Sequence, residues 1–316
     1  MTYASGSTIL AADYNGLVGT NPNTASGTLN TVWSTGGTTA GYGQTALATV
    51  AAGDSILAAS WANLVNRTAN AATHQGTTIT GVTAPSTGGV ITYLSAIPTN
   101  LTTIYSSRLN AATQGSTTSN AVTTASTWSS VATFTQTVTF ANGDAARYFF
   151  NSGGQLAITC SSPGGTGIDL LLNNLASNVG TVVLSAMNSG TANIGGTSYN
   201  GVTRIGGGGN SPTIGTNSGY YALTTSNANI YYQTASTGPS GYLSTNINIF
   251  AKSNGTQGGN GDAGSIITIY TVWDEIPNGL TVSSGSVTTL TVRPPEQTNI
   301  ANTWGTISLA GSVSVS

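Results

Sequence analysis

The hydrophobic pattern of the chain changes its period near residue 131, and this change divides the sequence into two parts. From Val131 to Phe140 apolar and polar residues alternate, which predicts a half-buried β-strand with Phe134 and Val138 on its apolar face. Upstream, the apolar spacing is typical of helices. Downstream, it is almost entirely typical of strands.

The upstream part contains an internal repeat in which residues 7–18 align with residues 54–65. Each copy has large apolar side chains at i, i+4, i+7 and i+8, which form one face of an amphipathic helix. Ser7 and Asp54 stand where N-caps are expected. Neither helix is long enough to be stable alone, so we expect them to pack together or on neighbouring subunits. The residues that we assign to docking or self-association are Leu10, Tyr14, Leu17, Leu57, Trp61 and Leu64.

The remaining residues upstream complete a small helical unit. Residues 19–53 are interpreted as a polar link between the repeat helices. The second repeat helix is expected to continue to about His74, because no Gly or Pro interrupts it, and a further helix is predicted over residues 100–112. The stretch 116–128 is rich in Ser, Thr and Asn, which predicts a linker.

Downstream of Phe140, turn residues separate many short apolar runs. Residues 142–154 are interpreted as turns around a short aromatic segment, and only residues 168–178 have helical spacing. Strands are predicted at 181–187, 219–224, 228–234, 243–252, 265–273, 286–292 and 306–315. The strand 265–273 is apolar on both faces, so we expect a central strand covered by a second sheet or another subunit.

These patterns predict an α+β fold that is mainly β. We expect a small N-terminal helical head (residues 1–115), a linker (116–128) and a jelly-roll-like β-sandwich (129–316). A chain of 316 residues is long enough for two modest cores.

The low content of charged residues indicates that the chain is part of a stable protein assembly. Only 4% of its residues are charged, whereas a typical soluble domain has roughly 25%. Neutral hydroxyl and amide surfaces pack against identical copies without stripping water from charges, which predicts self-association, with a homotrimer expected. The net charge of −2 gives no basic footprint for nucleic acid or anionic membrane. The sequence starts without a signal-peptide pattern, so we expect assembly in a cytoplasm.

Residues with chemical potential are few. His74 is the sole histidine and is interpreted as a polar helix end rather than a metal ligand. Asp274 and Glu275 are the only adjacent carboxylates and read as a solvated turn. Cys160 is interpreted as a small buried side chain. We therefore predict no catalytic residue, no cofactor and no metal site.

Tyrosines of the second half are the remaining candidates. Tyr221, Tyr232 and Tyr242 have Asn, Ser and Gly nearby, so they are candidates for stacking on a sugar ring. The alternative places one tyrosine of each adjacent pair in the core and its neighbour at a subunit contact, because successive strand residues face opposite ways.

Three passages together carry a resemblance to a known class of protein. The first is AADYN at 11–15 followed by GYGQ at 41–44, the second is ILAASWANLV at 56–65, and the third is DAARYFFNSGGQ at 144–155. In this order they resemble virion structural proteins of tailed phages, particularly phages that infect cyanobacteria and other aquatic bacteria. The usual Trp-Asn pair of these proteins is split here by Ala62.

The resemblance implies a non-enzymatic structural component of a virion, assembled in the host cytoplasm. Together with the low charge and the repeated helices, it leads us to expect a fibre or a tail- or neck-associated protein that docks by its N-terminal helices and self-associates through neutral β surfaces. Its expected partners are copies of itself, other proteins of the tail, neck or capsid, and a host surface glycan. The alternatives are a capsid decoration (cement) protein and a carbohydrate-binding adhesin module. An enzyme such as a depolymerase ranks last, because carboxylates are so few.

Overall fold

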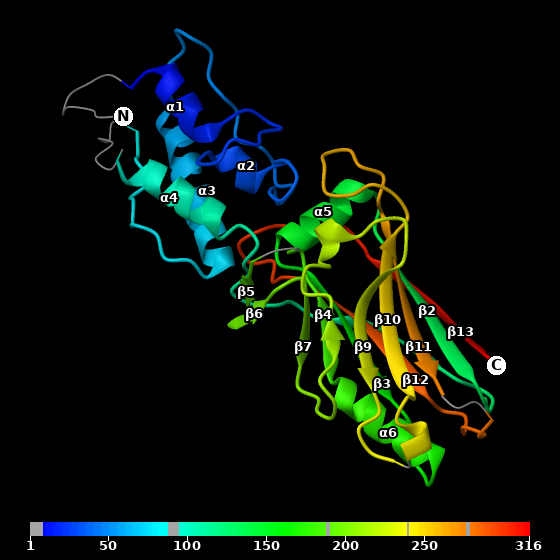
Figure 1. Cartoon of the computed structure of the whole chain (residues 1–316). Helices are drawn as coiled ribbons and strands as arrows, with labels where there is room; N and C mark the ends of the chain where they lie inside the picture. Colours follow the sequence, from blue (N-terminus) through cyan, green and yellow to red (C-terminus); the bar gives the residue numbers. More distant parts are fainter. Residues whose placement is uncertain (1–8, 88–94, 188–189, 239, 276–278) are drawn as a thin grey trace.

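The computed structural model describes residues 9–87, 95–187, 190–238, 240–275 and 279–316. A helical head lies against one end of a body made of two antiparallel sheets (Figure 1). The protein is therefore α+β and mainly β, as the sequence predicts. Its buried apolar side chains form one cluster that continues from the head into the sheets, so the two parts share a core.

The two copies of the repeat become helices that pack together in the head. The described helices of the head are α1 (Ala11–Val18), α2 (Leu29–Trp33), α3 (Ala58–Gln75) and α4 (Ala96–Ser106). The Tyr14 and Trp61 ring centroids are 6.0 Å apart, and the Tyr14 hydroxyl donates to the Ser60 carbonyl at 3.4 Å. Packing within the chain, the first of the two expected arrangements, is therefore confirmed.

The helix starts differ from the prediction. The N-cap residue of α3 is Leu57, so Asp54 lies outside the helix and its assignment as a cap is wrong. Ser7 lies outside the described residues. Leu10 is the N-cap residue of α1, and its N–H donates to the Asp13 carboxylate at 2.9 Å. A carboxylate in the first turn also suits the positive end of the helix dipole, which explains how this helix starts without a polar N-cap side chain.

The segment 19–53 is more than a polar link, because it contains α2, whose five residues are all buried. The Asn30 side chain donates to the carbonyls of Gly19 and Leu47, both at 2.8 Å, so one buried amide connects two loops. The helix predicted at 100–112 starts and ends earlier, as α4, since a proline is tolerated in the first turn of a helix.

The body is a sandwich of two sheets with strand orders β1-β12-β3-β4-β7 and β13-β2-β11-β10-β9-β8. The first contains β1 (Thr118–Thr123), β12 (Val287–Arg293), β3 (Gln155–Ser161), β4 (Thr181–Leu184) and β7 (Val202–Ile205). The second contains β13 (Ser308–Val315), β2 (Val131–Thr139), β11 (Ile266–Asp274), β10 (Asn246–Ser253), β9 (Ala228–Thr234) and β8 (Thr213–Ile214). A short hairpin, β5 (Ala192–Ile194) with β6 (Thr197–Tyr199), bonds to the head through Ala111.

Early and late strands alternate in the sandwich, as they do in a jelly roll. β12 lies between β1 and β3, and β11 lies beside β2. In contrast, β9, β10 and β11 follow one another as an antiparallel meander. Helix α6 (Ile168–Val179) packs on β3, β9 and β10, with Leu171, Leu172 and Leu175 buried, as its spacing predicts.

The alternation that opens the second part is confirmed in β2, where every second residue is buried. Gln136 is the polar member of that buried row, and its amide donates to the Asn120 carbonyl of β1 at 2.8 Å. β11 is a central strand, and Ile267, Ile269 and Trp273 are buried against the first sheet. The expected central position of the strand is confirmed, and the face that carries Ile266 and Tyr270 is half-buried.

Three segments differ from their predicted structure. The predicted linker at 116–128 contains β1, which pairs with β12 over six residues. Its Ser- and Thr-rich composition suits an edge strand as well as a linker, and the partner strand is remote in sequence. Residues 219–224, predicted to be a strand, contain the 3-10 helix η1 (Tyr220–Ala222). The segment 142–154, predicted to be turns, contains α5 (Gly143–Asn151), whose N-cap Asn142 accepts a bond from the Ala145 N–H at 2.8 Å.

Candidate functional site

The head and the sandwich meet at a junction between the 41–44 turn of the head and α5 of the sandwich. Ring packing holds α5 on the sandwich: Phe149 and Phe150 are fully buried, and Phe150 stacks on Tyr220 with ring centroids 4.2 Å apart. With its aromatic side chains held there, α5 extends Arg147 to the head.

Arg147 is a fully buried cation that connects the two parts. Its Nη1 donates to the carbonyls of Thr35 and Ala40 at 2.8 and 2.9 Å, and its Nε and Nη2 donate to Asp144 Oδ1 at 3.1 and 2.9 Å. Asp144 also accepts from the Gly261 N–H at 3.2 Å. A buried charge is tolerated only when it is paired and hydrogen-bonded, so these contacts fix the head loop on α5.

The glycines of the 41–44 turn allow the head to approach α5 closely. Gly43 has φ +70°, and a side chain there would overlap with the Tyr148 ring. Asn151, at the end of α5, donates to the Gly41 carbonyl at 3.1 Å. A residue with a Cβ at position 43 would therefore be strained twice, by its backbone angle and by the ring.

The same turn is bonded to a segment near the end of the printed sequence. The Gln44 side-chain amide donates to the Ala301 carbonyl at 2.8 Å and its oxygen accepts from the Ala301 N–H at 3.0 Å. The Thr303 hydroxyl donates to the Tyr42 carbonyl at 2.5 Å. These contacts place the turn between α5 and the segment that leads into β13.

His74 is buried in the last turn of α3 at this junction, which corrects its interpretation as a polar helix end. Its Nε2 lies 3.0 Å from the Ser152 carbonyl oxygen, and its ring meets Tyr42 edge-on with centroids 5.2 Å apart. Burial lowers the pKa of His74 to about 4, so the ring is neutral at pH 7. Because a carbonyl only accepts, Nε2 is the nitrogen that carries the proton.

The junction brings together the passages that carry the resemblance. The turn 41–44 packs on 144–155, and the Tyr42 hydroxyl accepts a bond from Gln75 of α3 at 2.7 Å. Helix α3 also contains most of the passage 56–65 and packs on α1. Sequence reasoning missed Arg147. A lone arginine within an aromatic run, three residues after an aspartate, is the signal from which it can be found.

The residues predicted to dock or self-associate fall into two groups. Tyr14, Leu17, Trp61 and Leu64 are buried in the head's own core. Leu10 and Leu57 are 60% and 63% exposed, and they occupy the same position in the two copies of the repeat. Within this set, only these two leucines have side chains available to a partner.

The three candidate sugar-binding tyrosines do not form one platform. Tyr221 uses its hydroxyl inside the junction, where it donates to the Thr38 carbonyl at 2.8 Å and bonds to Asn151. Tyr232 lies half-buried in β9, and Tyr242 lies in the 3-10 helix η2 (Ser240–Tyr242) beyond the other end of β9. A seven-residue strand spans roughly 20 Å, which separates Tyr221 from Tyr242.

Within each adjacent pair, the first tyrosine is in the core. Tyr220 and Tyr231 are fully buried, as the alternative interpretation predicts. Burial raises the pKa of both hydroxyls, which keeps them neutral. Whether Tyr232 contacts another subunit stays a prediction.

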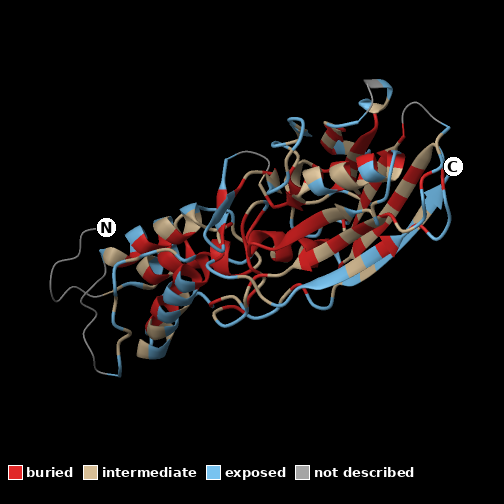
Figure 2. Ribbon diagram, turned by 90° about the horizontal axis from the view of Figure 1, so that it is seen from below, coloured by how far each residue is buried: buried red, intermediate tan, exposed pale blue. Residues whose placement is uncertain are grey.

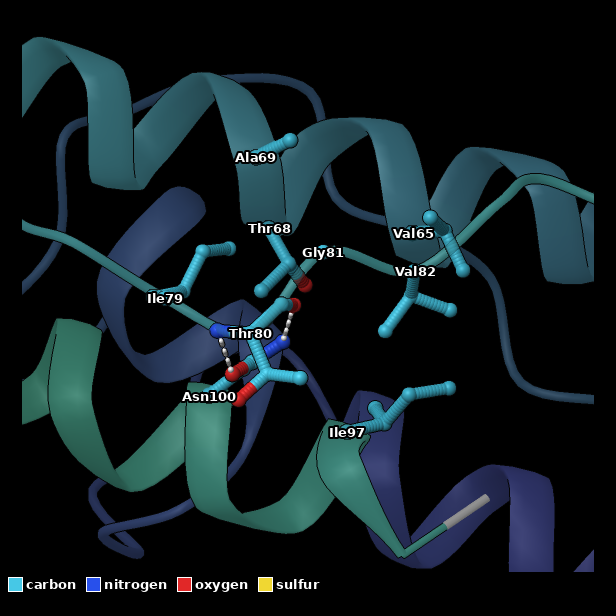
Figure 3. Close-up of a pocket in the computed structure, with 9 residues that line it drawn as sticks. All are labelled: Val65, Thr68, Ala69, Ile79, Thr80, Gly81, Val82, Ile97 and Asn100. Carbon is cyan, nitrogen blue, oxygen red and sulfur yellow. Dashed lines mark hydrogen bonds between the residues drawn. The ribbon is translucent and has the colours of Figure 1, made fainter. Parts of the chain in front are cut away.

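A small cavity opens in the head between α3, α4 and the extended segment 79–82 (Figure 3). Its volume is about 160 Å³, below the roughly 300–1,000 Å³ typical of ligand pockets. Asn100 supports its wall by bonding to both the N–H and the carbonyl of Thr80, at 3.0 and 2.8 Å. Apolar side chains of Val65, Ala69, Ile79, Val82 and Ile97 line the rest. The cavity is suited to one apolar side chain and not to a cofactor.

The remaining reactive groups are scattered. Glu275 is buried, which corrects its assignment to a solvated turn, and burial raises the pKa of its carboxyl. Cys160 is half-buried, which corrects its interpretation as a fully buried side chain, and desolvation by its neighbours raises the pKa of its thiol to about 12. Within the described ranges, no three His, Cys, Asp or Glu residues gather as a metal site. No helix among the described residues has the length and apolarity to span a bilayer.

No protein-family model matches the chain, and comparisons with curated proteins and with solved structures give no significant match.

Proposed function

We propose that the chain is a non-enzymatic structural component of a tailed-phage virion. In this proposal the helical head docks on other virion proteins, and the sandwich self-associates through its neutral surfaces. The resemblance of the three passages supports the proposal, and the role is that of a fibre or a tail- or neck-associated protein.

The observation that carries the proposal is the junction. Arg147, Gln44, His74 and Tyr221 all bond across it, and the apolar core continues through it. A docking module that is fixed to its body transmits position and force to it, which a flexible tether does not. This rigid coupling is what a particle component with a docking end requires.

Leu10 and Leu57 are the proposed docking contacts of the head. Each is the N-cap residue of its repeat helix, and each exposes most of its side chain. Burying a leucine side chain contributes about 1.5–3 kcal/mol, so the pair contributes at most about 3–6 kcal/mol to a contact between the head and an apolar partner surface.

The test is to locate the protein on particles. Gradient-purified virions from a culture infected with a phage that encodes this sequence are analysed by mass spectrometry and by gold-labelled antibody raised against the recombinant chain. We expect the chain in the particle band, with label at the tail or neck. Label across the head identifies a capsid decoration protein instead. Recovery of the chain only in the soluble lysate, or its turnover of a substrate, contradicts the proposal.

The docking contacts are tested in the same particles with the double variant Leu10→Gln and Leu57→Gln. We expect its incorporation to fall at least about tenfold, since two apolar contacts are replaced by polar ones. Leu170→Gln is the matched control, because Leu170 is also exposed (46%) but lies on α6, at the end of the sandwich away from the head (Figure 1). Equal incorporation of all variants rules out docking through the two leucines.

A further inference from the structure

The two sides of the sandwich differ in how their sheet edges are protected. On one side the edges are β7 and β8, with four and two residues, and β7 carries Arg204. On the other side the edges are β1 and β13, with six and eight residues, and neither contains a charged residue or a proline. The long edges therefore lack the devices that usually prevent pairing with another chain.

β13 is the longer of the two and pairs regularly along its whole length. It pairs with β2 in continuous register, from Ser308 opposite Thr139 to Val315 opposite Ala132, with no bulge. Six of its eight residues are exposed, and Figure 2 shows its end in pale blue beside the C-terminus. In an antiparallel strand half of the N–H and carbonyl groups point away from the neighbour. Within the described residues, no main-chain hydrogen bond from β13 reaches a further element.

The two open edges lie side by side. Gly311 sits in the middle of β13, and a side chain there would overlap with Val122 of β1. The backbone of β13 therefore lies directly against β1, so that the two edges form one uncharged side of the body. A partner that covers one edge also reaches the other.

The lack of charge on this side favours an identical partner. Two copies of a charged edge repel each other when the edges meet, whereas neutral Ser, Ala, Gly and Val side chains carry no such penalty. We propose that a second copy of this chain pairs with β13 in antiparallel orientation, so that the six-stranded sheet continues from one copy into the next. Identical strands related by a twofold axis present the same groups to each other, which makes the contact self-complementary.

This inference rests on the self-association in the proposed function and specifies its surface. A twofold contact gives a dimer, whereas the oligomer expected from the sequence analysis is a homotrimer. Measuring the oligomeric state therefore decides between them.

The experiment is native mass spectrometry and analytical ultracentrifugation of the full chain at micromolar concentration. We expect the unmodified chain to be a dimer and the double variant Ala310→Lys and Ser312→Lys to be a monomer, with its dissociation constant raised at least about tenfold by like charges across the edge. Thr213→Lys on β8 is the matched control, an exposed edge position on the protected side, and should leave the dimer unchanged. Circular dichroism of each variant verifies that the sandwich has folded.

Hydrogen exchange of residues 308–315 provides a second measurement that needs no substitution. We expect it to slow as the concentration rises through the dissociation constant. A monomeric or trimeric unmodified chain, or a lysine variant that stays dimeric, overturns the proposal. A monomer that is nevertheless found in virions overturns the pairing and leaves the virion role. A β13-paired dimer that is absent from virions supports the pairing and overturns the virion role.

Discussion

Replacing Arg147 with methionine tests how far the protein depends on its junction. The substitution keeps an apolar stem of similar length but removes every donor of the guanidinium. The Ala40 carbonyl, which is buried, loses its partner, and an unsatisfied buried group costs about 1–3 kcal/mol. Asp144 loses its counter-ion, although its side chain is 26% exposed and keeps the bond from Gly261. Breaking a buried pair from one side typically costs about 3–5 kcal/mol, so we expect a loss near the lower end, about 3 kcal/mol.

The assay is guanidinium denaturation followed by tryptophan fluorescence, which reports on Trp61 in the head and Trp273 in the sandwich. Arg67→Met is the control. Arg67 makes one exposed hydrogen bond, to the Thr45 carbonyl at 2.8 Å, which water replaces when the side chain is removed. Its expected effect is below about 1 kcal/mol. A similarly small loss for Arg147→Met refutes the reasoning that the buried cation holds the two parts together.

Two further predictions concern the same junction. Burial holds the pKa of His74 at about 4, below its ordinary value of 6.5, so the native state binds fewer protons than the unfolded state between these values. The contribution of His74 to stability is therefore full above about pH 6.5 and decreases as the pH falls to about 4, by about 2–3 kcal/mol at pH 4.5. Denaturation at pH 7 and at pH 4.5 measures this loss. If the His74→Gln variant loses as much stability between the two pH values as the unmodified chain, the prediction is wrong. Gly43→Ala should destabilise by more than Gly53→Ala in the same denaturation assay, because both have positive φ but only position 43 faces a ring, that of Tyr148. Equal losses would show that the ring contact does not matter.

The elements that the sequence predicts well are those in which apolar residues recur with the period of the element and form one buried face. β9 is predicted residue for residue at 228–234, and α6 and β2 differ from their predictions by one residue at an end. In these elements every second or every third to fourth side chain packs into the core, so the pattern alone determines the conformation. The repeat pairing of Tyr14 with Trp61 is predictable for the same reason.

The elements that sequence misses depend on partners far along the chain. β1 becomes a strand because β12 pairs with it, and nothing in its own Ser- and Thr-rich composition separates an edge strand from a linker. Arg147 and His74 look like surface residues until the opposite part of the protein covers them. The candidate site lies in this second class, since its bonds between the head and the sandwich join segments that only the tertiary structure brings together.

The bonds between Gln44 and Ala301 join residues that are 257 positions apart. At about 5–20 residues per second, a ribosome takes roughly 10–50 s to travel from one to the other. Throughout that interval the helices of the head lack the segment around Ala301 on which the 41–44 turn packs. Their uncharged surfaces are then exposed to neighbouring nascent chains on the same messenger RNA. The head is thus synthesised before the sandwich but completes its packing only after it. The yield of folded protein therefore depends on how well the cell protects the head from aggregation while translation continues.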